Sequence, residues 1–175
     1  MKTYIAFLRG INVGGHKKIL MADLRLLFES LGLKDVQSYI QSGNVVFSSK
    51  EESNLANKIA EAIEAKYGFS VPVLVKKVSE LSEILSKCPF FDQKREKSYF
   101  ILLEESPTKE SIEFIAAFSN LNEEFYIAQN CVYIYYAVGA GKAKMGNNFF
   151  EKKLKVKATA RNYRTMAKLL ELTTL

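Results

Sequence analysis

The chain has 175 residues, 48% of them hydrophobic, so it can bury a substantial core in one domain or in two small ones. This composition argues against a disordered chain, and no apolar run approaches the roughly 20 residues that a membrane-spanning helix needs. The start leads directly into a strand pattern without a signal peptide, which predicts a cytoplasmic protein with no membrane partner. Cys88 and Cys131 lie in dissimilar contexts and are expected to be free thiols.

The net charge of +6 is concentrated in the last quarter of the chain. Residues 138–175 hold nine basic and two acidic residues, a net +7, which leaves about −1 for the first 137 residues. Such a basic segment attracts polyanions or phosphorylated small molecules through its field. A solvated face that keeps the protein soluble is the other interpretation.

The first half of the chain follows the order strand, helix, strand, strand, helix, strand. Strands are expected at residues 3–8, 36–40, 45–49 and 71–76, and helices at 20–31 and 55–65. Gly32 and Gly68 end the helices, and residues 41–44 form a hairpin turn. This order is the split pattern of a ferredoxin-like unit, so residues 1–77 are predicted as a first ferredoxin-like half.

The second half repeats this order of strands and helices imperfectly. After a connecting helix near residues 79–86 and a polar segment at 92–97, the predicted elements are a strand at 99–103, a helix at 112–118, hairpin strands at 125–128 and 132–137, and helices at 147–154 and 162–172. No linker separates the halves, so residues 78–175, with their basic C-terminal helices, are expected to form one compact body with the first half. The predicted fold is α+β: duplicated ferredoxin-like halves with antiparallel sheets, plus C-terminal helices.

The loop at residues 9–18 joins the first strand to the first helix and holds three of the nine glycines. Glycine at this density indicates a left-handed backbone or the close approach of another group, because it otherwise costs backbone entropy. Arg9, His16, Lys17 and Lys18 surround the loop's backbone N–H groups with positive charge, which is the chemistry of an anion site. A tight turn with solvated lysines explains the same residues, so both interpretations stay open.

Three motifs carry a resemblance to a known family. They are YIAFLRGINVGG at residues 4–15, QSGNVVF at 41–47 and TARNYRT at 159–165. With these motifs in this order, the chain resembles, end to end, the bacterial family catalogued as domain of unknown function 1697. The family has no established activity, so the resemblance implies a fold and assigns no reaction.

No familiar catalytic motif is complete. Gly10 and Gly15 have part of the Walker spacing, but His16 follows where the motif needs lysine, and the glycine spacing also fails the dinucleotide fingerprint. His16 is the sole histidine, so a Ser-His-Asp triad or a histidine-rich metal site would need it in every role. The sequence assigns no catalytic residue, metal or cofactor, and leaves open whether the protein is an enzyme. The paired acids are interpreted as solvated ends of elements: Glu51-Glu52, Glu104-Glu105 and Glu123-Glu124.

We predict that Arg9 and Arg161 approach one cleft, because guanidinium groups suit bidentate capture of phosphate or carboxylate. The Gly14-Gly15 backbone would form the floor of this cleft, with asparagine side chains as neutral partners. The expected ligand is a small phosphorylated or otherwise anionic molecule. The predicted ligand-binding residues are Arg9, Gly10, Asn12, Gly14, Gly15, Lys17, Lys144, Arg161 and Asn162.

A nucleic-acid-binding module that uses the basic C-terminal quarter is the alternative, since RNA-recognition modules share the split strand–helix pattern. On the last predicted helix, a basic stripe is formed by Arg161, Arg164 and Lys168. The aromatic candidates for base stacking are Tyr133, Tyr135 and Tyr136, although partly buried strand residues explain them as well. A discrete pocket with convergent cations would favour the small ligand, and a continuous positive stripe with exposed aromatics would favour nucleic acid.

Overall fold

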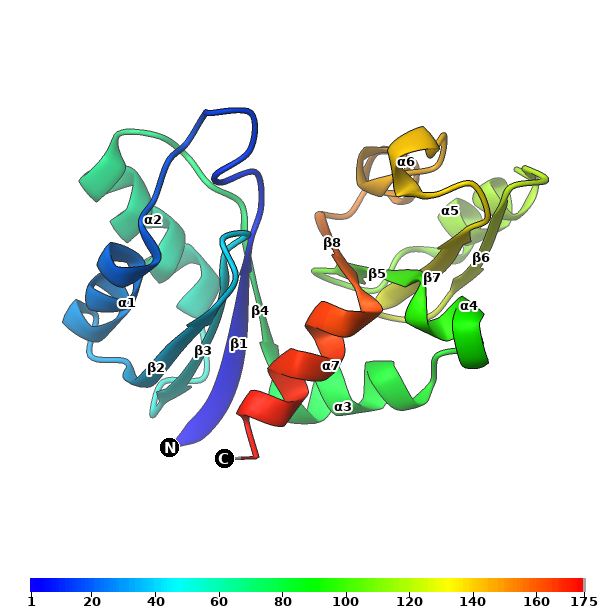
Figure 1. Cartoon of the computed structure of the whole chain (residues 1–175). Helices are drawn as coiled ribbons and strands as arrows, with labels where there is room; N and C mark the ends of the chain where they lie inside the picture. The colour runs from blue at the N-terminus through cyan, green and yellow to red at the C-terminus, as the bar shows by residue number, and fades with distance from the viewer. Residues whose placement is uncertain (175) are drawn as a thin grey trace. The chain divides into compact units, whose positions relative to one another are not determined.

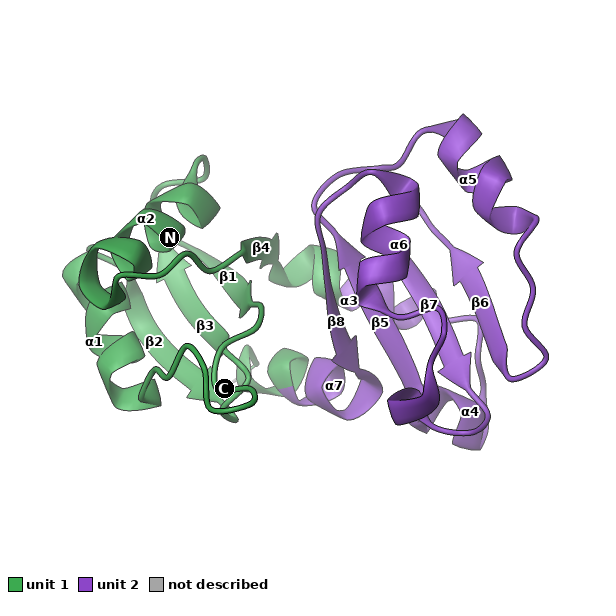
Figure 2. Cartoon of the chain, turned by 90° about the horizontal axis from the view of Figure 1, so that it is seen from above, with its two compact units in different colours: residues 1–81, 169–175 green, residues 82–168 purple. Residues whose placement is uncertain are grey.

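A computed structural model describes residues 1–174 and divides the chain into two compact units. The first unit comprises residues 1–81 and the segment from residue 169 onward, and the second comprises residues 82–168 (Figure 2). The described chain holds two four-stranded antiparallel sheets and seven α-helices, so the predicted α+β fold with two similar halves is confirmed. Within residues 1–174, no helix combines the length and the apolar character needed to cross a bilayer.

The first unit is built on a sheet with the strand order β2-β3-β1-β4. Its elements are β1 (Lys2–Leu8), α1 (Met21–Ser30), β2 (Lys34–Tyr39), β3 (Asn44–Ser49), α2 (Leu55–Tyr67) and β4 (Val73–Lys77), followed by the start of α3 (Val78–Ser86). Both crossover helices, α1 and α2, lie on the same face of the sheet (Figure 1). The predicted order of strands and helices in this half is therefore observed.

Alternation along β1 explains why both helices cover that face. Tyr4, Ala6 and Leu8 are buried in one apolar cluster with Phe47 of β3, while the intervening residues point to the opposite face. The helices contribute residues at helical spacing to the same cluster, among them Leu24, Phe28, Ile59 and Ile63. This core fixes the end of β1, from which the glycine loop departs.

The second unit repeats the arrangement with the strand order β6-β7-β5-β8. Its elements are α4 (Asp92–Glu96), β5 (Ser98–Leu103), α5 (Lys109–Ala116), β6 (Glu123–Ile127), β7 (Cys131–Tyr136), a 3₁₀ turn (Ala140–Lys142), α6 (Asn147–Leu154), β8 (Ala158–Asn162) and the first turns of α7 (Tyr163–Leu172). Each strand occupies the position of its counterpart in the first sheet. The order of elements and the order of strands are thus duplicated.

One face of the second sheet packs against α5 and α6. Val132 and Ile134 of β7 share a buried cluster with Ile115 of α5 and with Phe150 and Leu154 of α6. Figure 2 shows the second unit from above, with α6 lying over its sheet. The two crossover helices again cover a single face.

Two elements differ from the sequence prediction. Residues 158–162 form strand β8, which pairs with β5 so that Arg161 lies opposite Phe100. The prediction that Arg161 belongs to a basic helical stripe is therefore wrong, because α7 begins only at Tyr163. Pairing with a neighbouring strand decides the state of a segment this short, and its own composition does not. Residues 92–96, treated as a polar connection, form the short helix α4.

Candidate functional site

The glycine loop contains a tight two-residue turn. Gly14 and Gly15 have φ values of 59° and 77°, and the N–H of His16 donates to the carbonyl of Val13 at 3.1 Å. Positive φ at both central residues is the signature of a type I′ hairpin turn. The demands of this turn account for both glycines, which supports the structural interpretation of these two residues.

The side chain of Asn12 holds this loop in place. Its Nδ2 donates to the carbonyls of Ile19 at 3.0 Å and Gln41 at 2.9 Å, and its Oδ1 accepts from the N–H of Ile19 at 2.9 Å. Lys17 is also engaged, since its Nζ donates to the carbonyl of Ser70 at 2.6 Å. Asn12 therefore ties the loop to the β2–β3 turn, and Lys17 ties it to the segment before β4.

A cavity of about 380 Å³ lies beside the loop. Asn12 and Gly15 line it together with Ile19, Tyr67 and the oppositely charged Lys18 and Asp23. The cavity thus brings together two of the six residues predicted for this unit. The others are Arg9, Gly10, Gly14 and Lys17, and they do not line it.

In the second unit, the carboxylate of Glu123 anchors the loop that follows β7. Glu123 is 6% exposed and accepts hydrogen bonds from the backbone N–H groups of Lys144 at 2.6 Å and Met145 at 2.7 Å. The interpretation of this acid as a solvated strand end is therefore wrong. The carboxylate of Glu123 therefore accepts the hydrogen bonds that these two backbone N–H groups could otherwise donate to an anion.

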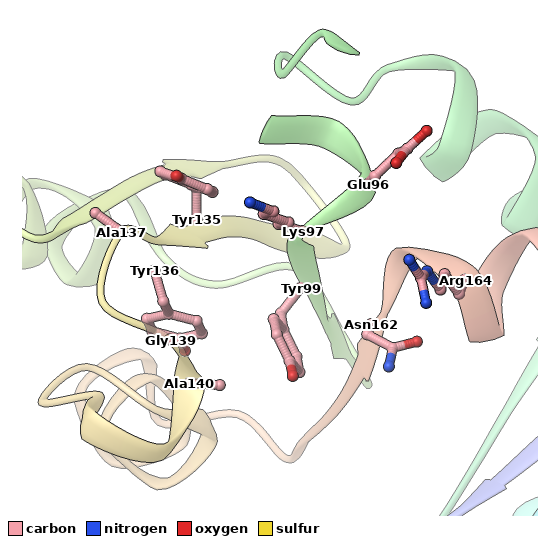
Figure 3. A pocket seen from close by; sticks show the side chains of 10 residues that line it. All are labelled: Glu96, Lys97, Tyr99, Tyr135, Tyr136, Ala137, Gly139, Ala140, Asn162 and Arg164. Atoms are coloured by element: carbon pink, nitrogen blue, oxygen red, sulfur yellow. The ribbon is translucent and has the colours of Figure 1, made fainter. Parts of the chain in front are cut away.

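A cavity of about 410 Å³ lies where β5 begins, β7 ends and β8 passes into α7 (Figure 3). Its lining residues come from these element ends and from the start of the 3₁₀ turn. They are Glu96, Lys97, Tyr99, Tyr135, Tyr136, Ala137, Gly139, Ala140, Asn162 and Arg164. Among the predicted site residues, Asn162 lines this cavity, while Lys144 and Arg161 do not.

Two exposed cations border this cavity. Neither Lys97 nor Arg164 forms an ion pair with any residue from 1 to 174. Glu96 is the acidic residue of the lining, and Figure 3 shows its carboxylate directed away from Tyr99 and Asn162. The cavity therefore has an excess of positive charge that the described protein groups do not neutralise.

Asn162 and Arg161 have separate roles at the end of β8. The Oδ1 of Asn162 accepts from the N–H of Thr165 at 2.9 Å and caps the first turn of α7. The Nη1 of Arg161 donates to the carbonyl of Ala160 at 2.8 Å, and burial of the guanidinium lowers the pKa of Arg161 to about 10. The capping bond uses the oxygen of the Asn162 amide and leaves its NH₂ group to donate elsewhere.

The sequence did not single out Lys97 and Tyr99 as site residues. Strand pairing places Tyr99 of β5 opposite Asn162 of β8, and Lys97 comes just before β5 and lines the same cavity. The sequence could indicate that Tyr99 and Asn162 are neighbours only if residues 158–162 were recognised as a strand. Arg164 was noted only as a member of the basic stripe.

Two of the three tyrosines considered for base stacking are core residues. Tyr133 and Tyr136 are 3% and 8% exposed, and their hydroxyls donate to the carbonyls of Ile84 at 2.8 Å and Met145 at 3.0 Å. Desolvation by burial raises the pKa of both hydroxyls. Neither ring offers an open face for an unstacked base.

We therefore expect weak, salt-sensitive binding of short DNA or RNA oligonucleotides. The basic segment attracts phosphates, but Tyr133 and Tyr136 are buried and cannot form a stacking platform with Tyr135 for successive bases. Fluorescence anisotropy should show little binding at physiological salt. Tight binding under those conditions, lost on Tyr135→Leu, would restore the nucleic-acid alternative.

Arg9 belongs to the first unit and Arg161 to the second. Arg9 follows β1, and its backbone N–H donates to the carbonyl of Pro72 at 3.0 Å. Arg161 lies within β8. That both arginines bind the same ligand stays a prediction.

Comparisons with known proteins give a family and a fold. The chain is similar in structure to a conserved bacterial protein, SP0830 from Streptococcus pneumoniae, with a TM-score of 0.71, 22% sequence identity and coverage of 98% of each chain. At this identity the likeness shows the fold alone. No curated protein matches the chain. The family model described as protein of unknown function (DUF1697) matches residues 1–133, more than half of the sequence. The chain therefore belongs to the DUF1697 family.

Proposed function

We propose that the protein binds a small anionic ligand, carrying a phosphate or carboxylate group, in the 410 Å³ cavity of the second unit. The observation that carries this proposal is the pair of cations, Lys97 and Arg164, that border the cavity without an ion-pair partner among residues 1–174. Unneutralised cations at a concave site favour an anion. The proposal does not assign a reaction.

The donors at the cavity suit a tetrahedral or planar anion. The guanidinium of Arg164 can offer two parallel N–H groups, and the ammonium of Lys97 offers a point charge. The amide NH₂ of Asn162 adds a neutral donor, since only the oxygen of this side chain is used in capping α7. The volume lies within the range of small-molecule sites, about 300–1,000 Å³.

The other residues that the sequence predicts for the site are proposed to assist ligand binding. Arg9, Lys17, Lys144 and Arg161 are proposed to contribute positive charge to ligand capture, and Gly10, Gly14 and Gly15 are proposed to set the shape of the loop at residues 9–18. Asn12 is proposed to act through the loop that it holds. We also propose a cytoplasmic location, because the buried thiols of Cys88 and Cys131 form no disulfide within residues 1–174, as expected in a reducing compartment.

The variant Arg164→Ala tests the proposed site. Isothermal titration calorimetry with ribose 5-phosphate should show an affinity at least about tenfold lower than that of the wild type, because a charge-assisted hydrogen bond contributes about 1.5–3 kcal/mol. Lys152→Ala is the matched control. It removes one exposed positive charge from α6 of the same unit, outside the cavity lining.

The control variant should bind as the wild type does. Equal losses in both variants would mean that the ligand responds to net charge and not to this cavity. An absence of binding by the wild type, or unchanged binding by Arg164→Ala, would contradict the proposal.

A further inference from the structure

We propose, resting on the anion site above, that the ligand carries a flat aromatic ring joined to its anionic group, as in a nucleoside monophosphate. The ring is inferred to stack on Tyr99. Tyr99 is half-buried, lines the cavity, and its hydroxyl makes no hydrogen bond with a residue from 1 to 174. One part of the side chain packs against the apolar cluster of the second unit, and the part that lines the cavity is available to a ligand.

The ring of Tyr99 is held in position before any ligand arrives. Tyr99 lies on β5, which pairs with a strand on each side, and it is opposite Ile134 of β7 and Asn162 of β8. Its ring meets that of Tyr136 edge to face, with centroids 5.5 Å apart and an interplanar angle of 64°. Tyr136 is itself fixed by the hydrogen bond to Met145. A preorganised ring loses little conformational entropy when a ligand stacks on it.

Small residues leave space beside this ring. Gly139 and Ala140 line the cavity, and a Cβ added to Gly139 would meet no atom within 4 Å. Figure 3 shows the Tyr99 ring between Asn162 on one side and Tyr136, Gly139 and Ala140 on the other. The cavity wall at Gly139 is therefore not filled by a side chain.

The charge of the cavity selects between the two kinds of group that an aromatic face accepts. A tyrosine face binds either a cation or another flat ring. Lys97 and Arg164 would repel a cation, so the ring is the complementary choice. With the cations engaging the anionic end, one molecule would satisfy both parts of the cavity.

Calorimetry with two probes that share a phosphate tests this inference. Adenosine 5′-monophosphate should bind the wild type about fivefold or more tightly than ribose 5-phosphate does, because the stacking of a base on an aromatic side chain favours binding by about that factor or more. Tyr99→Leu should remove this difference, so that the two probes bind the variant with equal affinity. Tyr99→Phe, which keeps the ring, should retain the difference.

The outcomes separate the two proposals. If both probes bind equally and Arg164→Ala weakens both, the anion site stands and the aromatic ligand class is wrong. If neither probe binds, both proposals fail. If Tyr99→Leu keeps the wild-type difference between the probes, the ring does not stack on Tyr99, and this inference is overturned. Circular dichroism of Tyr99→Leu would show that the variant is folded.

Discussion

Replacing Gly43 with alanine is expected to destabilise the first unit by about 3 kcal/mol, because the new side chain meets both steric overlap and an unfavourable backbone angle. Gly43 has a φ of 81°, and a Cβ at this residue would lie 2.6 Å from the Cβ of Leu8 and 2.9 Å from the Cδ1 of Ile11. Leu8 is fully buried at the end of the central strand β1, where it pairs with Val73 of β4, and it cannot move away without distorting β1. Urea unfolding of the purified variant would measure the loss.

Gly32→Ala is the matched control for this prediction. Gly32 has a nearly identical φ of 83° in the same unit, but a Cβ there would meet no atom within 4 Å. Its replacement should cost about 1 kcal/mol, the contribution of the backbone angle alone. Since both variants make the same change to the unfolded chain, the difference between them isolates the steric overlap. Equal losses would contradict the close packing of the β2–β3 turn against Leu8.

Replacing Glu123 with alanine is expected to destabilise the second unit by about 2–4 kcal/mol, since it leaves two backbone donors without their acceptor. The N–H groups of Lys144 and Met145 both depend on this carboxylate, and Met145 is buried. Glu123→Gln should lose less, because its amide oxygen can still accept one of the two hydrogen bonds. Thermal unfolding monitored by circular dichroism would compare the variants.

The adjacent residue provides the control. Glu124 pairs with Lys94 at 2.6 Å in a partly exposed ion pair, which lowers the pKa of the Glu124 carboxyl. Surface pairs of this kind contribute about 0–1 kcal/mol, so Glu124→Ala should have little effect. If removing Glu124 cost as much as removing Glu123, the loop after β7 would not depend on the buried carboxylate.

Hydrophobic periodicity predicted most of the fold because it records which face of each element is buried. The strands and helices of the first half follow directly from the spacing of apolar residues. The glycines after α1 and α2 mark the ends of both helices. β8 could not be predicted in this way. Its residues, Ala158–Asn162, have weak strand preference, and their pairing with β5 involves partners far away in the sequence.

The roles of individual polar side chains could not be predicted from the sequence. It selected Asn12, but the amide of Asn12 is used inside the protein to hold the loop. It assigned Glu123 to solvent, because a charged residue beside a second acid at a strand end resembles an exposed terminus. Such roles depend on hydrogen-bond partners from distant segments. Only the three-dimensional arrangement reveals them.

A crystal structure of the wild-type protein with adenosine 5′-monophosphate would test the central claim, the anion site of the second unit, most directly. We expect the phosphate within hydrogen-bonding distance of the guanidinium of Arg164, with Lys97 or Asn162 as a further donor, and the adenine ring against Tyr99. Phosphate density elsewhere on the protein, with this cavity empty at saturating nucleotide, would contradict the claim.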